Sequence, residues 1–520
     1  MKLKTTALLA ACGVLLSAAG AFAVPIHGPS IATADPSTTA SKAGLGGESG
    51  SWDTSSGARI TAGDTLLMDA RLGHASLPKA SRGETYLFAQ VTASEDKATA
   101  SSVATPMNLA VVIDRSGSMK GERIANAMNA AVFALERMRD GDSITVVSFD
   151  TAAQVVVPPT RVNAGNRSSI EAAIRNIRLG GDTCISCGLG EGMQQLALTT
   201  LGGDRINRMI LLSDGATNAG VRDVSGLRAM ANRMLGRGVT ISTIGVDVDF
   251  DEKIMAAIAN EANGRHYFVA NASGLPAVFG QEFDDLLASV AKETELSIEL
   301  GPGVEVAEVF DRSFRREGNR LIVPFGTFSA NQEKTVLVKL RVPSDREGEQ
   351  PVADLKLAFR DLAKKTDGTC SGSLVTSVRS DGSEQRELDP FVAARLERSR
   401  TAQTLTEANK LFEAGRIGEA RAKLAARKDD LKKTESAALA FAAAAPTSAP
   451  RRSARALDRD FADQAAAVAE AEQNFAPPAV AARPTSAEPT GGSFAPPPPS
   501  LREGKAQVRA NQEKASQLGF

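Results

Sequence analysis

The sequence predicts an α/β protein: a doubly wound, mostly parallel sheet, followed by a small antiparallel β-sandwich and a C-terminal helical hairpin with a disordered tail. Between residues 106 and 291, apolar runs of strand length alternate with segments of helical periodicity, as in doubly wound sheets. Residues 292–385 change to a period of two, with Gly, Pro and Ser between the runs. Residues 386–433 return to a helical pattern, and residues 434–520 are rich in Ala and Pro.

The composition excludes several functional classes. The chain has 520 residues, 42% of them hydrophobic, which is enough for more than one buried core. Sixty Lys and Arg balance 61 Asp and Glu, so no surplus of positive charge favours nucleic acid as a partner. The three histidines, His27, His74 and His266, lie too far apart for a His-rich zinc site. The chain also lacks the G-x-x-x-x-G-K-[ST] and G-x-S-x-G motifs of P-loop proteins and nucleophile-elbow hydrolases.

The N-terminus predicts export. Residues 1–23 combine the basic Lys2 and Lys4, an apolar stretch and a closing Ala-Phe-Ala, which together are typical of a cleaved signal peptide. The alternative is a bacterial lipobox ending at Cys12, which would then carry an N-terminal lipid anchor. No later stretch reaches 18 uncharged apolar residues, so we expect no transmembrane helix in the mature chain. The expected location is secreted or periplasmic, in the cell envelope.

The segment before the α/β region divides in two. Residues 24–79 consist mostly of Ala, Ser, Thr and Gly with little periodicity, which predicts a disordered linker. Residues 80–105 contain the alternating run Tyr86–Val91, which predicts a strand that joins the later sandwich.

The α/β region resolves into strands and helices in turn. The expected strands are Asn108–Ile113, Ser143–Phe149, Met209–Leu212, Val239–Val246 and His266–Val269. The expected helices are Glu122–Arg139, Ser168–Ile177, Leu227–Leu235, Glu252–Ala262 and Phe279–Val290. Ser168, followed three residues later by Glu171, has the spacing of a capping box at a helix N-terminus.

The C-terminal half combines strands, a hairpin and a tail. The expected sandwich strands are Leu296–Leu300, Val304–Val309, Arg320–Phe325, Lys334–Val342 and Asp354–Phe359. The helical pattern in residues 388–433 resembles half of a tetratricopeptide repeat, which cannot bury its own apolar face and must dock on a neighbour. Ten of the 23 prolines fall after residue 445, so the tail is expected to be largely disordered apart from one helix over residues 453–474.

Polar side chains follow the predicted strands where those strands end. Asp114, Ser116 and Ser118 follow the first strand, Thr183 precedes a helix, and Asp214 follows the strand from Met209. Ligand sites of open α/β sheets lie at this edge. Convergence of the three loops would gather five oxygen donors and no nitrogen or sulfur, which suits a hard divalent cation: Mg²⁺, or Mn²⁺ or Ca²⁺. Two carboxylates and three neutral hydroxyls leave the coordination of such a cation open, so a partner's Asp or Glu would complete it.

The pattern D-x-S-x-S, then Thr, then Asp resembles the von Willebrand factor type A domain and its metal-ion-dependent adhesion site. The resemblance covers residues 106–291, with support from Ile244–Val246 and Asp249–Glu252. It implies a Rossmann-like fold in which the two serines and the threonine are direct or near-direct ligands, while the two aspartates hold the metal partly through waters. The order of the flanking regions resembles that of bacterial envelope members of the family.

Two cysteines depart from this pattern, because Cys184 and Cys187 directly follow Thr183. In an oxidising compartment neighbouring cysteines pair, and a disulfide here would stiffen the metal loop. One alternative is a redox-active C-x-x-C at a helix N-terminus, where the helix dipole lowers a thiol pKa. Another is a pairing that involves Cys370, which is otherwise left over.

These observations favour a protein-binding or adhesion module that captures an acidic partner residue through a divalent cation. The first alternative is a structural envelope scaffold with a silent metal site. The second is a metal-dependent hydrolase, in which the cation would activate water. No general base is evident beside the metal loops, since His266 lies on a later strand. The chain is therefore predicted not to be an enzyme.

Overall fold

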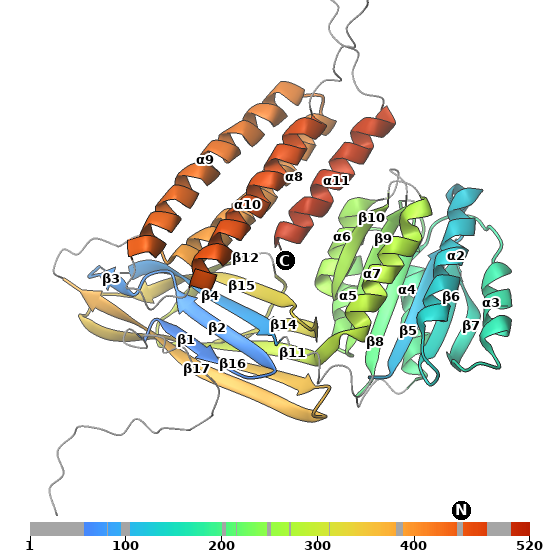
Figure 1. Cartoon of the computed structure of the whole chain (residues 1–520), viewed down its shortest axis with the longest axis horizontal. Coiled ribbons are helices and arrows are strands. Elements are labelled where there is room, and N and C mark those ends of the chain that lie inside the picture. The colour runs from blue at the N-terminus through green and yellow to red at the C-terminus, as the bar shows by residue number, and fades with distance from the viewer. Residues whose placement is uncertain are drawn as a thin grey trace, which may run out of the picture. The chain divides into compact units, whose positions relative to one another are not determined.

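The computed structural model describes residues 57–80, 82–94, 105–199, 204–214, 216–246, 251–269, 272–310, 312–380, 388–444, 451–475 and 501–519. All of them belong to one compact unit. The predicted signal peptide, residues 1–23, and the lipobox residue Cys12 lie outside the described residues. Figure 1 shows an α/β sheet, a pair of antiparallel sheets and a group of long helices.

The predicted doubly wound, mostly parallel sheet is confirmed. Its strands lie in the order β10-β9-β8-β5-β6-β7, and only β7 runs antiparallel to its neighbour. The strands are β5 (Met107–Asp114), β6 (Ser143–Phe149), β7 (Ala153–Arg161), β8 (Ile206–Ser213), β9 (Val239–Val246) and β10 (Asn263–Val269). Every residue of β5, β6, β8 and β9 is buried, as expected for parallel strands that are covered on both faces.

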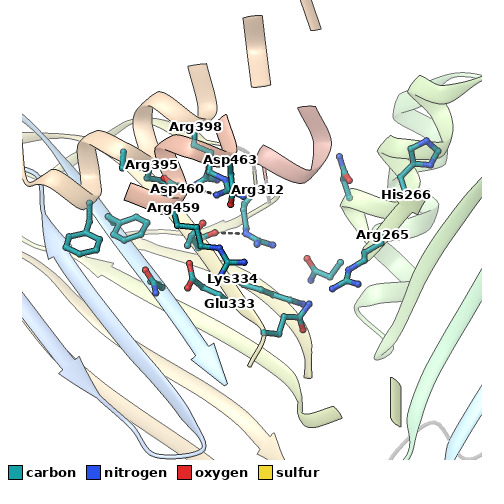
Figure 2. Close-up of a pocket in the computed structure, with 18 of the residues that line it drawn as sticks. Arg265, His266, Arg312, Glu333, Lys334, Arg395, Arg398, Arg459, Asp460 and Asp463 are labelled. Carbon is teal, nitrogen blue, oxygen red and sulfur yellow. Dashed lines mark hydrogen bonds and ion pairs between the residues drawn. The ribbon is translucent and has the colours of Figure 1, made fainter. Parts of the chain in front are cut away.

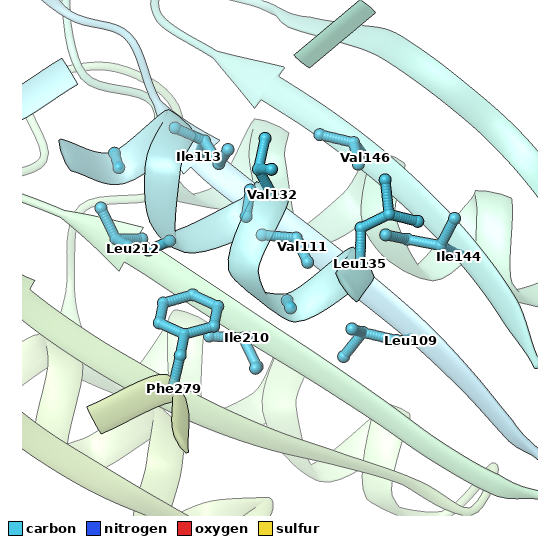
Figure 3. Packing of buried hydrophobic residues seen from close by; sticks show 14 of the residues in the cluster. Leu109, Val111, Ile113, Val132, Leu135, Ile144, Val146, Ile210, Leu212 and Phe279 are labelled. Atoms are coloured by element: carbon cyan, nitrogen blue, oxygen red, sulfur yellow. The ribbon is translucent and has the colours of Figure 1, made fainter. Parts of the chain in front are cut away.

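Helices cover both faces of this sheet. They are α2 (Glu122–Arg137), α3 (Arg167–Arg175), α4 (Ile185–Ala197), α5 (Val224–Leu235), α6 (Glu252–Glu261) and α7 (Leu275–Leu287). Leu109, Val111 and Ile113 of β5 pack in one cluster with α2, α3 and α7 (Figure 3). The alternate residues Ala110 and Val112 pack in a second cluster with α4, α5 and α6. The period-two alternation of a strand thus divides the core into two layers.

Two local predictions in this region were incomplete or wrong. β7 was not predicted because Pro158 and Pro159 interrupt its pattern. It lies at the sheet edge, where the missing backbone N–H groups of proline cost little. The expected capping box at Ser168 does not form, since α3 begins earlier and Asn166 is its N-cap residue. The Asn166 amide closes the preceding turn, donating to the Arg161 carbonyl at 2.8 Å.

The two other sheets pack face to face, and they are antiparallel except for the parallel pair β17 and β3. One has the order β1-β2-β4-β15-β12 and the other β13-β14-β11-β16-β17-β3. The strands are β1 (Arg59–Ala62), β2 (Leu66–Leu72), β3 (Ser76–Pro78), β4 (Arg82–Ala93), β11 (Ser289–Leu300), β12 (Glu305–Phe310), β13 (Arg315–Glu317), β14 (Arg320–Ser329), β15 (Glu333–Pro343), β16 (Gly348–Asp361) and β17 (Thr366–Arg379). A single apolar cluster lies between them. β4, which contains the run Tyr86–Val91, pairs antiparallel with β15.

The linker predicted for residues 24–79 is corrected within its described part. Residues 59–78 contribute β1, β2 and β3, and β2 begins with three consecutive apolar residues, Leu66, Leu67 and Met68. Leu66, Met68 and Ala70 of β2 are fully buried and face the sandwich core. Leu66, Met68, Ala70 and Leu72 recur with the period of two that is typical of a strand buried on one face, and the prediction of a linker overlooked this signal.

The helical region is longer than expected. It comprises α8 (Pro390–Glu413), α9 (Ile417–Ala444), α10 (Arg451–Asn474) and α11 (Leu501–Gly519). A shared apolar cluster includes Leu405, Leu424, Phe461 and Val508, one from each helix. Within the predicted disordered tail, residues 434–520, α10 agrees with the helix that was expected over residues 453–474. The continuation of α9 to Ala444 and the helix α11 were not predicted, and both contribute apolar residues to this cluster. Within the described residues, none of the helices has the length and apolar character needed to cross a bilayer.

Candidate functional site

The first predicted loop folds back on itself at the end of β5. Asp114 is the last residue of β5, and the Ser116 backbone N–H donates to its Oδ1 atom at 2.8 Å. The Gly117 N–H then donates to the Gly181 carbonyl at 3.1 Å, which ties the first loop to the second, two residues before Thr183. The second loop lies between α3 and α4, so this hydrogen bond joins segments that are 64 residues apart in sequence.

Hydroxyl groups connect the first loop to the third. Ser118 Oγ donates to Asp214 Oδ1 at 2.7 Å and lies 3.0 Å from Ser116 Oγ. Ser213 Oγ donates to the other oxygen of Asp114, Oδ2, at 2.5 Å. Four of the five predicted site residues therefore belong to one hydrogen-bonded group.

Thr183, the fifth residue, is held by its backbone. Its side chain is buried, and its N–H donates to Asn218 Oδ1 at 2.7 Å. Its carbonyl accepts from the N–H groups of Asn218 and Ala219 at 3.0 and 3.2 Å and from Thr217 Oγ1 at 3.1 Å. The segment after Asp214 thus fixes the second loop. Thr217 and Asn218 were not predicted, although Thr and Asn so soon after a strand are typical turn residues.

The two site carboxylates lie in a desolvated environment. Asp114 is completely buried, and burial raises its pKa to about 6, against hydrogen bonds from Ser213 and Ser116 and with help from the Asp214 charge. Burial also raises the pKa of Asp214, while Ser118 and Arg123 act to lower it. Two buried carboxylates so close together favour a cation that would neutralise them.

Arg123 supplies one such positive charge and was not predicted. Its Nη1 atom lies 2.8 Å from Asp214 Oδ2 and 2.8 Å from the Ser118 carbonyl oxygen. Arg123 is the second residue of α2, at the end of the helix where the macrodipole disfavours a cation. A basic residue at that unfavourable position was the signal in the sequence.

The donor set fits a hard cation. It contains two carboxylates and three hydroxyls and no nitrogen or sulfur, which suits Mg²⁺ better than zinc or copper. Within the described part of the chain, no group of three or more His, Cys, Asp or Glu is placed to hold a metal ion. Coordination here would therefore depend on the serine and threonine hydroxyls and on water.

A disulfide borders the second loop, and the structure contains the predicted pair, Cys184 and Cys187. Cys184 is the N-cap residue of α4, and its N–H donates to the Asp150 carbonyl at 2.8 Å. The Asp150 carboxylate in turn pairs with Arg115 of the first loop at 3.1 Å. Cys370 carries a free, partly buried thiol on β17, and burial raises its pKa to about 11.

A cavity of about 1020 Å³ lies away from these loops and contains none of the five predicted residues. Figure 2 shows Arg265 and His266 on one side of it. On the other side, the Arg395 and Arg398 guanidiniums donate to the Leu518 carbonyl at 3.1 and 3.0 Å, and so fasten α11 to α8. Burial lowers the pKa of His266 to about 3, and its Nδ1 lies 2.9 Å from Thr243 Oγ1. None of these groups belongs to the predicted site.

Comparison with known proteins agrees with this fold. Residues 108–281 match the family model of the von Willebrand factor type A domain. A 301-residue stretch is 26% identical to an uncharacterized protein of Synechocystis and covers 55% of this chain and 69% of that protein. A solved von Willebrand factor type A protein from Catenulispora acidiphila superposes with a TM-score of 0.61 at 17% identity, covering 72% of this chain and 88% of its own. The solved structure of the ArnB paralog VWA2 from Sulfolobus acidocaldarius superposes with a TM-score of 0.55 at 14% identity. This match covers 88% of this chain and 100% of that one.

Proposed function

Because residues 108–281 form a von Willebrand factor type A domain, we propose that this chain is a protein-binding or adhesion module. It captures an Asp or Glu side chain of a partner protein through a divalent cation. The residues that would hold the cation are Asp114, Ser116, Ser118, Thr183 and Asp214. The observation that carries the proposal is the hydrogen-bonded group in which Ser116, Ser118 and Asp214 meet beside the buried Asp114.

The chemistry of the site supports this choice of ligand. Domains of this family commonly bind a divalent metal, and the oxygen-only donor set favours Mg²⁺, or Mn²⁺ or Ca²⁺. Two carboxylates balance the cation's charge but leave the rest of its coordination to neutral hydroxyls and water. A carboxylate from a partner would gain a charge-assisted bond to the cation, which a neutral side chain would not.

We propose no catalytic role for the site. Hydrolysis would need a general base within reach of a metal-bound water. Both site carboxylates already accept hydrogen bonds, from Ser213 and Ser116 at Asp114 and from Ser118 and Arg123 at Asp214.

The proposed location is outside the cytoplasm, secreted or periplasmic. The signal-peptide pattern of residues 1–23 and the Cys184–Cys187 disulfide support it.

Capture from the native cell envelope tests the proposal. Wild type with Mg²⁺, wild type with EDTA and Asp114→Ala serve as baits, and Asp140→Ala is the control because that side chain is exposed on the same domain. We expect EDTA and Asp114→Ala to abolish capture, while Asp140→Ala retains it. Capture that survives both chelation and Asp114→Ala would favour the alternative, a structural scaffold with a silent metal site.

A further inference from the structure

The candidate metal site contains a positively charged side chain, Arg123. We propose that Arg123 is a built-in counter-ion that a divalent cation must displace from Asp214, so that this arginine sets the metal affinity of the site. The inference rests on the proposed function, because it concerns the cation through which a partner would be captured.

The geometry places Arg123 directly on a site carboxylate. Its Nη1 atom is shared between Asp214 Oδ2 and the Ser118 carbonyl, at 2.8 Å from each. Asp214 Oδ1 already accepts the Ser118 hydroxyl at 2.7 Å. Both oxygens of Asp214 therefore already accept a hydrogen bond from the protein itself, and a cation or its bound water that approaches Oδ2 meets the guanidinium there.

Electrostatics makes the two cations competitors. The Asp114 and Asp214 carboxylates carry two negative charges, which a divalent ion neutralises alone, whereas Arg123 and the ion together leave the site positive. The Asp214 side chain is fully buried, so repulsion between the guanidinium and the metal would be weakly screened. Metal binding therefore favours departure of the guanidinium from the carboxylate.

The guanidinium of Arg123 can move from Asp214 into the solvent. Its side chain is 27% exposed and reaches Asp214 from the rim of the site, so rotation of its flexible stem can return the guanidinium to water. Its place in the first turn of α2 does not hold it there, because a positive charge at a helix N-terminus is disfavoured. Without a metal ion, the guanidinium of Arg123 neutralises the Asp214 carboxylate. When Mg²⁺ binds, it replaces the guanidinium as the positive charge at this carboxylate.

Calorimetric titration of the full chain with Mg²⁺ tests the exchange. Arg123→Gln keeps a hydrogen-bond donor but removes the charge, and we expect it to bind Mg²⁺ about tenfold more tightly than wild type. Arg123→Lys keeps the charge and is expected to bind like wild type. Arg137→Gln is the matched control, since it removes an arginine at the other end of the same helix, where it pairs with Asp284.

An independent measurement uses the wild-type protein, so it does not depend on how the variants fold. The Arg123 Nε–H resonance, assigned by its loss in Arg123→Gln, is expected to move on saturation with Mg²⁺. Equal Mg²⁺ affinity of wild type and Arg123→Gln, or a resonance that stays in place at saturation, overturns this inference and leaves the proposed function standing. Absence of Mg²⁺ binding in wild type and in every variant overturns the proposed function together with it.

Discussion

At the scale of the residue, Ser118 has two roles in the site that a single substitution can test. Its hydroxyl donates to Asp214, and it is one of the predicted neutral ligands. We expect Ser118→Ala to lower Mg²⁺ affinity about tenfold, because a ligand is lost and Asp214 loses a hydrogen bond. The melting temperature without metal should change little, since the Ser118 side chain is exposed.

Titration calorimetry measures that affinity, and Ser225→Ala is its control. The Ser225 hydroxyl also donates to an aspartate, Asp223, but at the start of α5 and outside the site. An unchanged Mg²⁺ affinity in Ser118→Ala would remove Ser118 from the ligand set.

Cys184 and Cys187 provide a second prediction at the residue scale. The disulfide closes a loop of only a few residues, so its loss in Cys187→Ser should lower the free energy of unfolding by no more than about 2 kcal/mol in the chain-entropy estimate. Urea unfolding measures this, and a reducing agent should bring wild type to the same value. Cys370→Ser should leave the unfolding curve unchanged, because that thiol is unpaired. A drop several times larger in Cys187→Ser would mean that the disulfide does more than close this loop.

At the scale of the element, α4 positions the second loop by approaching the sheet closely through glycine. A Cβ atom on Gly188 would lie 2.6 Å from the Phe149 ring and 2.9 Å from Val112, whereas one on Gly190 would meet nothing within 4 Å. Gly188→Ala is expected to destabilise the protein by about 1 to 3 kcal/mol through overpacking. Gly190→Ala should stabilise it by about 0.5 to 1 kcal/mol, since alanine is the better helix former.

Chemical denaturation of the two variants decides between these signs. Because the substitution is identical and the positions are two residues apart, differences in helix propensity cancel in the comparison. Stabilisation by both variants would show that α4 can move away from the sheet without cost, and the second loop would then not depend on this contact.

At the scale of the whole molecule, one ion pair joins α11 to the α/β domain over 257 residues of sequence. Arg509 Nη1 lies 2.5 Å from Glu252 Oε2. Burial nevertheless raises the pKa of Glu252 from 4.5 to about 7, against the opposing effect of Arg509. The folded state therefore holds this proton more tightly than the unfolded state. The resulting stability is fully present below pH 4.5 and is lost as the pH rises through about 7.

The prediction is measured as a difference between two proteins. Glu252→Gln cannot titrate, so its free energy of unfolding should fall less than that of wild type between pH 4.5 and pH 7. Other groups, among them the neutral buried His266, titrate alike in both proteins and cancel. Parallel stability curves would show that Arg509 keeps Glu252 ionised throughout this range.

The α/β domain and the residues of the candidate site could be predicted from the sequence alone, because local sequence patterns indicate both. Strands such as Met107–Asp114 and Ile206–Ser213 are mostly apolar runs that lead into D-x-S-x-S and Asp214, while Thr183 precedes the helix α4. The rule that parallel strands end at one edge then placed these residues together. Only the tertiary structure decided which groups surround them. Arg123 and Asn218 reach the site through hydrogen bonds to Asp214 and Thr183, and no local pattern identifies these partners. The same holds for α11, which is too polar to be recognised as ordered until distant helices cover its apolar residues.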